Sequence, residues 1–143
     1  MLLIPLNATV NGVGKVRRLI QTAVSLICLG IIFGGVTYAR GRRLLRQTDL
    51  HRVYEQINRE SFDGELPDVS VVWGDLTGDY GLTIFYPDNS VKIVIDRQSV
   101  TSEHQLRETL SHESCHVLTR YLVEQTGQDA HGPAFKACMA RFK

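Results

Sequence analysis

The sequence predicts an α+β domain preceded by one transmembrane helix. Three observations lead to this fold class: a charge-free apolar run of 21 residues near the N-terminus, three short segments rich in β-branched and aromatic residues, and helical periodicity on both sides of those segments. The chain of 143 residues has room for one compact domain. We expect a basic N-terminal segment over residues 1–18, a transmembrane helix over 19–39, a basic juxtamembrane linker over 40–48 and a folded domain over 49–143.

The apolar run over residues 19–39 is close to the roughly 20 residues that cross a bilayer as a helix. Two other interpretations fit part of the pattern: a cleaved signal peptide, because Ala39 is a small residue at a suitable place, and a core helix of a soluble protein. A signal peptide usually has an apolar region of only about 7–15 residues. A core helix of about six turns rarely lacks a polar face. These arguments favour a retained membrane span.

Formal charge divides the chain at Asp49. Residues 1–48 hold seven basic residues and no acidic ones, whereas residues 49–143 hold nine basic and fifteen acidic residues, a formal charge of −6. A negative surface repels phosphate groups, so the folded domain is not expected to bind nucleic acid. Three basic residues precede the apolar run and four follow it, and this small excess favours a cytoplasmic folded domain. The oligomeric state stays open.

A short helix is expected to open the folded domain, because Leu50, Val53, Tyr54 and Ile57 recur at helical spacing behind a possible Asp49 cap. An Asp-Gly pair and a proline end it. Strands are expected next over residues 69–73, 80–86 and 91–95, because turn residues separate these segments. They predict a small three-stranded sheet.

A second helix is expected to begin after Ser102, whose hydroxyl can cap the first turn while Gln105 completes a capping box, and to end before Gly127. Its apolar stripe should pack on the sheet and consists of Leu106, Leu110, Val117 and Tyr121, with Leu118 and Leu122 beside it. A last helix is expected to start at Pro133 and to direct three apolar residues inward: Phe135, Met139 and Phe142.

The second helix carries the motif HESCH at residues 112–116. His112 and His116 are four residues apart, so their imidazoles project from one helix face and can share one metal ion. Glu113 is then placed beside a water molecule that the metal polarises, and it can take that water's proton. Peptide hydrolysis needs this arrangement. We therefore predict a zinc site with Glu113 as its catalytic base.

A catalytic zinc site needs a third protein ligand. The longer pattern HExxHxxGxxH is absent, because neither its glycine nor its third histidine is present. Glu124, Asp129 and His131 remain as candidates. Glu124 lies more than two turns further along the same helix and cannot reach the same ion. We expect His131, with Asp129 as the alternative or as a partner that orients a ligand imidazole.

These residues resemble the SprT-like metalloproteases, which include the Spartan proteases that act on DNA–protein crosslinks. The resemblance covers residues from about 49 to 143 and rests on five parts: the segment 58–67, Val72-Trp73, Gly81, the HESCH motif and the segment 131–135 with the sequence HGPAF. It implies a compact zincin-like order of helix, three-stranded sheet, HExxH helix and C-terminal helix. It also implies zinc held by His112, His116 and His131, with Glu113 as catalytic acid and base. The cytosolic habit of the family again favours a cytoplasmic domain.

The sequence therefore predicts a membrane-anchored zinc metallopeptidase that acts on a protein or peptide. One alternative is a zinc-stabilised module that binds a partner at the membrane without cleaving it. Glu113 disfavours this alternative, because a purely structural site has no use for a base. The other alternative is a repair protease for DNA–protein crosslinks, which the charge of −6 disfavours, as does the lack in this sequence of the DNA-binding modules that many relatives carry.

Three cysteines, an odd number without a pairing pattern, predict free thiols. Cys28 lies in the apolar run, and Cys115 is expected to be a small buried residue. Cys115 and Cys138 could still pair with each other. The residue that stabilises the transition state stays open among five possible donors: Tyr80, Tyr86, His104, Arg120 and Tyr121.

Overall fold

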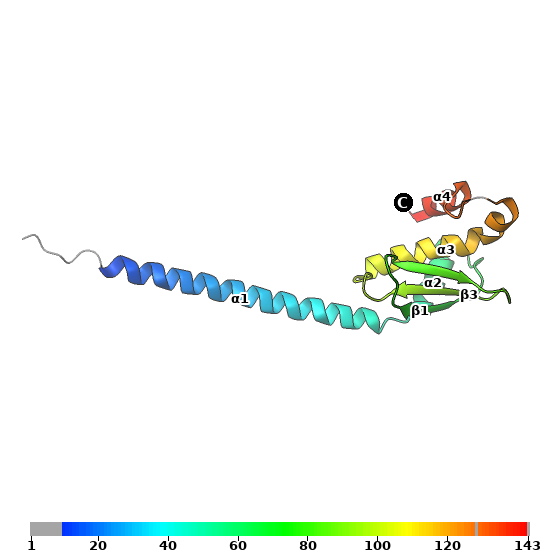
Figure 1. Ribbon diagram of the computed structural model, residues 1–143. Helices are drawn as coiled ribbons and strands as arrows, with labels where there is room; N and C mark the ends of the chain where they lie inside the picture. The colour runs from blue at the N-terminus through cyan, green and yellow to red at the C-terminus, as the bar shows by residue number, and fades with distance from the viewer. Residues whose placement is uncertain (1–9, 128, 143) are drawn as a thin grey trace, which may run out of the picture. The chain divides into compact units, whose positions relative to one another are not determined.

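The computed structural model describes residues 10–127 and 129–142. The chain divides into two compact units between Gly41 and Arg42. The first unit contains most of one long helix, α1. The second contains the remaining helices and the sheet (Figure 1).

The helix α1 (Val10–Arg46) has 37 residues. From Ile20 to Arg46 it is long and apolar enough to span a membrane. Between Ile20 and Leu44, the large apolar side chains that the structure describes are exposed; Ile27, for example, is 63% exposed and Ile31 is 69% exposed. An apolar helix is thus found where the sequence predicts a membrane span.

The segment expected as a juxtamembrane linker, residues 40–48, is helical as far as Arg46. Contacts within the second unit, which begins at Arg42, explain the difference. Leu45 is buried in the core of that unit, and the Arg46 guanidinium lies 5.4 Å from the centre of the Trp73 ring. The end of α1 is therefore part of the folded unit.

The helix α2 (Leu50–Ser61) begins behind Asp49, whose carboxylate accepts a hydrogen bond from the Arg52 N–H at 3.2 Å. The predicted cap is confirmed. The Tyr54 hydroxyl donates to the Pro67 carbonyl at 2.8 Å, which ties the helix to the segment that leads into the sheet. The face that α2 buries consists of Leu50, Tyr54 and Ile57.

The three predicted strands are confirmed as β1 (Ser70–Gly74), β2 (Gly81–Phe85) and β3 (Val91–Asp96). β3 lies in the centre, parallel to β1 and antiparallel to β2. The order β1-β3-β2 makes β2 an edge strand. Ile93 and Ile95 of β3 are fully buried. Alternate residues of a strand point to the same face, so these two mark the face that the helices cover.

The helix α3 (Glu103–Thr126) starts and stops where the sequence predicts. The Ser102 hydroxyl accepts from the Gln105 N–H at 3.2 Å, and Gly127 ends the helix with a φ of +66°. The Gln105 side chain accepts from the Thr101 N–H at 2.9 Å, rather than from the N–H of the capping serine. The capping box is thus displaced by one residue.

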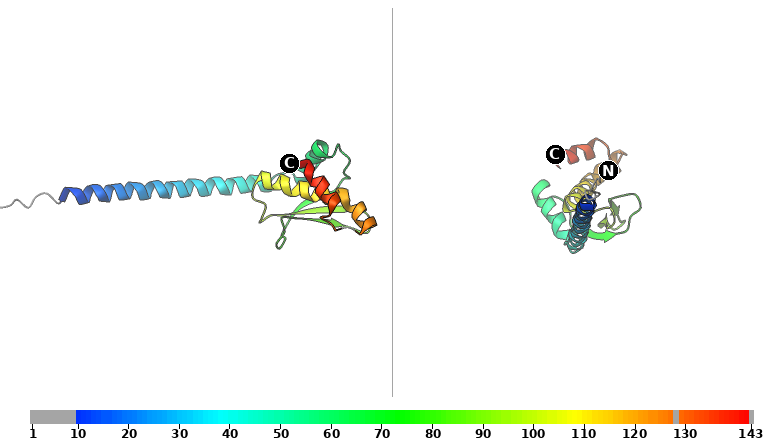
Figure 2. Two further views of the ribbon diagram at one scale, coloured as in Figure 1. Left: turned by 90° about the horizontal axis from the view of Figure 1, so that it is seen from above. Right: turned by 90° about the vertical axis from the view of Figure 1, so that its left-hand side faces the viewer.

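The second unit has two layers, with the helices on one side of the sheet (Figure 2). α2 contacts β1, α3 contacts β2 and β3, and the two helices contact each other. The last helix, α4 (Pro133–Met139), packs on α3 and continues into a short 3₁₀ turn, η1 (Ala140–Phe142). Phe135 is buried as expected, and Met139 and Phe142 pack against the core.

The apolar stripe of α3 is confirmed at Leu106, Leu110 and Val117, which are buried. The prediction is wrong at Leu122, which is 48% exposed. The side chain of Tyr121 lies outside the described part of the chain.

The cysteines depart from the sequence-based expectation. Cys115 of α3 and Cys138 of α4 form a disulfide, with their Cα atoms 5.7 Å apart. The burial expected for Cys115 is found, since neither residue is more than 3% exposed. The expectation of free thiols is wrong for this pair because the packing of α4 on α3, which sequence spacing does not reveal, brings the two residues together.

Candidate metal centre

The helix α3 presents two imidazoles side by side. The Nε2 atoms of His112 and His116 are 3.3 Å apart, and both rings are half-buried. The spacing of four residues puts the two side chains on one face of the helix. The motif therefore folds into a pair of nitrogens that point at a common position.

A third imidazole joins them from the turn between α3 and α4. His131 Nε2 is 3.3 Å from His112 Nε2, and the ligand atoms of all three histidines lie within 4.8 Å of one another. The Asp129 carboxylate accepts a hydrogen bond from the His131 backbone N–H at 2.9 Å. This bond shapes the turn that carries the third imidazole.

The ring of Phe135 forms the apolar support of the cluster. Its centroid lies 4.8, 4.5 and 4.7 Å from the ring centroids of His112, His116 and His131, respectively. Because Phe135 belongs to α4, the first turn of this short helix packs against all three imidazoles. Rings held by packing lose little conformational freedom when they bind a ligand.

The cluster fits zinc by both chemistry and geometry. Neutral imidazole nitrogens are common zinc ligands, and two such ligands of a tetrahedral ion lie about 3.3–3.4 Å apart. The two Nε2–Nε2 separations of 3.3 Å match that value. Burial lowers the pKa of His116 to about 4, with further contributions from His112 and His131. Burial also lowers the pKa of His112. Both rings are thereby kept neutral, which is the form that binds metal.

Glu113 lies next to this cluster and is only 4% exposed. Its Oε2 accepts a hydrogen bond from the Thr83 hydroxyl of β2 at 2.6 Å. Burial raises the pKa of Glu113, and the hydrogen bond from Thr83 partly opposes that shift. A carboxylate that binds a proton more readily than usual is suited to act as a general base.

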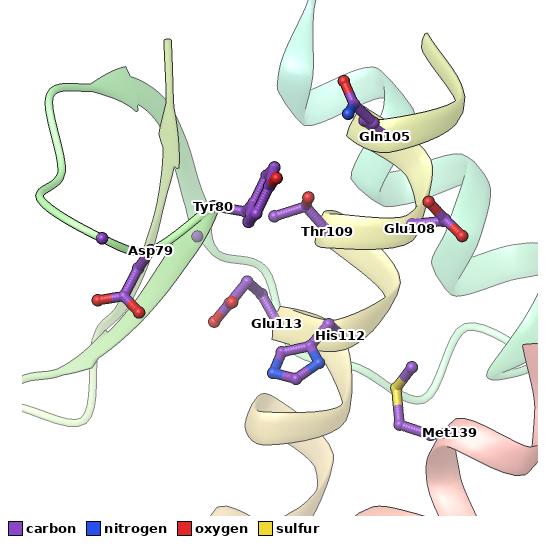
Figure 3. Close-up of a pocket in the computed structure, with 10 residues that line it drawn as sticks. Asp79, Tyr80, Gln105, Glu108, Thr109, His112, Glu113 and Met139 are labelled. Carbon is purple, nitrogen blue, oxygen red and sulfur yellow. The ribbon is translucent and has the colours of Figure 1, made fainter. Parts of the chain in front are cut away.

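A cavity of about 510 Å³ opens beside Glu113 and His112. Figure 3 shows both side chains projecting from α3, with the segment that carries Asp79 and Tyr80 on the opposite side. Met139 of α4 lines the cavity from another side. The cavity therefore gives an extended molecule a place to lie against the carboxylate and the imidazole.

Comparison with protein families adds independent support. The SprT-like family matches residues 50–143, which is more than half of the chain. The chain belongs to the SprT-like family. Membership indicates a zinc-dependent, protease-like domain. No curated protein matches the chain.

The other candidates for the SprT-like site lie apart from the three histidines. Asp129 contacts the backbone of His131 and is not among the clustered groups, while Glu124 pairs with Arg120 at 2.8 Å. Of the five possible transition-state donors, Tyr80 lines the cavity. His104 pairs with Glu108 at 3.1 Å. The Arg120 guanidinium also lies over the Phe85 ring, and the Lys92 ammonium lies over the ring of Tyr86.

Sequence reasoning missed two residues that shape the SprT-like site. Thr83 contacts the carboxylate of Glu113, and no sequence pattern marks it. Asp96 is 1% exposed and accepts the N–H of Leu76 at 2.8 Å and that of Ser99 at 2.6 Å. These bonds, that of Leu76 most of all, lower the pKa of Asp96 to about 2. Asp96 thus anchors the start of the loop that reaches the cavity.

Proposed function

We propose that residues 49–143 form a zinc metallopeptidase domain that α1 anchors to a membrane, and that its substrates are proteins or peptides at or near that membrane. The observation that carries the proposal is the set of three imidazole nitrogens next to a buried carboxylate and an open cavity. His112 Nε2 lies 3.3 Å from each of the other two nitrogens, and all three lie within 4.8 Å of one another. Membership of the SprT-like family supports it.

Each residue of the centre has a separate role. His112, His116 and His131 would hold the zinc ion. When bound, zinc supplies Lewis-acid chemistry: it polarises a water molecule and lowers the pKa of that water towards about 7. Glu113 accepts a proton as the water attacks the peptide carbonyl, and it returns the proton to the leaving amine nitrogen.

Tyr80 is the donor that the structure favours for stabilising the charge that develops on the carbonyl oxygen. Its ring is 53% exposed and lines the same cavity as Glu113. A hydroxyl at the cavity wall can approach a bound substrate without rearrangement of the fold. Three of the other residues considered from the sequence, Tyr86, His104 and Arg120, do not line this cavity, and the side chain of Tyr121 lies outside the described part of the chain.

The charge of the domain supports protein rather than nucleic acid as its substrate. Residues 49–143 carry a formal charge of −6, which opposes binding to a phosphate backbone. The exposed apolar side chains of α1 support a position at the membrane. A repair protease for DNA–protein crosslinks is the weaker proposal for these reasons.

The decisive experiment replaces Glu113 with Gln in the full-length protein. The amide is nearly isosteric, so zinc content and thermal stability should change little. The amide cannot accept a proton at neutral pH, and cleavage of unfolded and membrane-derived protein substrates should fall by about 10²–10⁴-fold. Glu124→Gln is the matched control, since this exposed glutamate lies on the same helix, pairs with Arg120 at 2.8 Å and does not line the cavity, and this variant should cleave like the parent.

Three quantities are measured for the parent, the Glu113→Gln variant and the control: zinc per chain, melting temperature and the rate of peptide-bond cleavage. A Glu113→Gln variant that cleaves like the parent would remove Glu113 from the mechanism. If parent and variant both hold zinc and neither cleaves any substrate, a zinc-stabilised binding module replaces the peptidase. If the parent protein retains no zinc after it has been incubated with zinc, the whole proposal is overturned.

A further inference from the structure

A residue of the edge strand β2, Thr83, binds the carboxylate of Glu113. Thr83 Oγ1 lies 2.6 Å from Glu113 Oε2 and 3.3 Å from the Glu113 backbone carbonyl. A hydroxyl has one proton to donate, and the shorter contact with the charged acceptor takes it. Among the described residues, Oε1 has no hydrogen-bond partner. One carboxylate oxygen is therefore fixed and the other is available.

Gly81 keeps space for the second oxygen. A Cβ atom at this position would lie 2.8 Å from Glu113 Oε1, 2.9 Å from Glu113 Cγ and 2.7 Å from Thr109 Cγ2. Contacts under 3.0 Å are too short for real Cβ atoms, so any larger residue would displace the carboxylate. Gly81 and Glu113 both line the cavity. A glycine is thus required at position 81 because a Cβ atom there would lie too close to the carboxylate.

We propose that β2 is a positioning element for the base: the Thr83 hydroxyl fixes Oε2, and the bare backbone at Gly81 lets Oε1 face the cavity. Thr83 acts through Glu113 and is a positioning residue, not a catalytic one. This inference rests on the proposed peptidase function. A base must lie within hydrogen-bond reach of the proton that it removes, and a misplacement of about 1 Å can cost about a hundredfold in rate.

The kinetic test uses full-length protein and a matched set of variants at one position. Thr83→Val removes the hydroxyl and keeps the shape, so kcat should fall about 10–100-fold with KM and zinc affinity close to the parent values. Thr83→Ser restores the hydroxyl and should restore most of kcat. Thr119→Val is the control, because this buried hydroxyl donates to the Cys115 carbonyl at 2.8 Å and does not contact Glu113. Gly81→Ala should lower kcat like Thr83→Val.

A stability cycle on zinc-free protein tests the contact without any need for activity. Thr83→Val leaves a buried carboxylate without its donor and should raise the unfolding equilibrium constant about tenfold. In a Glu113→Ala background the same change should have little effect, because the acceptor is already gone. Additive effects in the cycle, or a Thr83→Val variant that changes KM alone, would overturn the inference. If the parent cleaves no substrate, the peptidase proposal fails, while the cycle still decides the contact.

The disulfide carries a second inference, which concerns the membrane. It joins Cys115 and Cys138 within the second unit, and both residues are buried. Disulfides persist in oxidising compartments and are rare in the cytosol, where thiols are kept reduced. Formation of this bond transfers two electrons and two protons from the two thiols to the disulfide of an oxidised dithiol protein, which becomes two thiols.

We infer that the second unit lies on the oxidising side of the membrane and that the N-terminus lies in the cytoplasm. The sequence favoured the opposite arrangement through one extra basic residue after the apolar run and through the cytosolic habit of the family that it resembles. Two of the four basic residues after the run are engaged by the folded unit: Arg42 donates to the Gln98 carbonyl at 2.8 Å, and Arg46 lies over the ring of Trp73. The numbers of basic residues on the two sides of the apolar run are too similar to decide the orientation, so the disulfide decides it.

The test counts free thiols in the full-length protein from native membranes. After denaturation, a maleimide polymer should add one mass increment before reduction, at Cys28, and three increments after it. A Cys115→Ser variant should give two increments under both conditions. Protease added to sealed vesicles with the cytoplasmic face outward should leave the second unit intact. Three increments before reduction, or digestion of that unit in these vesicles, would overturn the inference.

Discussion

The candidate metal centre is assembled from two stretches of chain that are held in different ways. His112 and His116 stand on α3, a capped helix of 24 residues, so helix geometry alone fixes their separation. His131 stands on a turn, and its position depends on a hydrogen bond from its own backbone and on the ring of Phe135. The first arrangement is local, and the second requires the packed fold.

Because the two sides are held differently, substitutions on them should have different effects on metal affinity and folding stability. A substitution on the helix side should remove one metal contact and leave the rest of the fold in place. A substitution on the turn side should change folding stability and metal affinity together, because the same contacts provide both. Five variants in the full-length protein test this distinction.

The largest effect is expected from His116→Ala and His131→Ala, one from each side. Partners that only orient a metal ligand are worth about 10–100-fold in affinity, so loss of a ligand should cost about a hundredfold or more. Competition with a chromogenic zinc chelator measures this loss. If a variant keeps the zinc affinity of the parent, the replaced histidine is not a zinc ligand. Another residue must then be the third ligand.

Phe135→Ala should produce the next largest effect and the clearest coupling. Removing a buried phenylalanine typically costs about 3–5 kcal/mol of unfolding free energy, and loss of support for three imidazoles should weaken zinc about tenfold. Phe142→Ala is the control, since this ring packs on Phe62 at 5.6 Å and does not contact the histidines. If both variants lose stability and neither loses zinc affinity, α4 does not orient the ligands.

Asp129→Ala should weaken zinc by less than about tenfold, because it removes the acceptor of the His131 N–H and leaves the imidazole itself in place. Asp129→Asn keeps an oxygen acceptor and should lie between the parent and the alanine variant. The same chelator competition gives the order. A larger loss for Asp129→Ala than for His131→Ala would exchange the roles of the two residues.

Gly127→Ala should have the smallest effect on the metal. This residue ends α3 with a φ of +66°, a conformation that costs a residue with a Cβ about 1–2 kcal/mol. Denaturant unfolding of the zinc-free protein should show that loss, while zinc affinity should stay close to the parent value. A fall in affinity like that of Asp129→Ala would show that the helix end also sets the third imidazole.

Much of the fold could be predicted from the sequence, because it follows from local patterns. Asp49, Ser102 and Gly127 mark helix ends through their own backbone and side-chain chemistry. The strand segments could also be recognised locally, because turn residues separate short runs of β-branched and aromatic residues. The sheet order, with β3 in the centre, was not predicted, because pairing between distant strands leaves no local signal.

The candidate site divides along the same line. The helical spacing of His112 and His116 follows from the sequence alone, whereas the closeness of His131 is a property of the packed fold. Thr83 could not be found from sequence, because its partner is 30 positions away and its type is common in strands. The pairing of Cys115 with Cys138 was only an alternative from the sequence, because the two residues are 23 positions apart and no local pattern shows that the packing of α4 on α3 joins them.

That disulfide also acts on the chain before it folds. The linked residues are 23 positions apart, and both His116 and His131 lie inside the loop that the bond closes. In the chain-entropy account, closing a loop of this size removes conformational entropy from the unfolded chain and so raises its free energy by about 3 kcal/mol at room temperature. The oxidised unfolded chain therefore keeps two imidazoles at a high effective concentration, so that zinc meets both of them early and the capture of the ion and the folding of the domain proceed together.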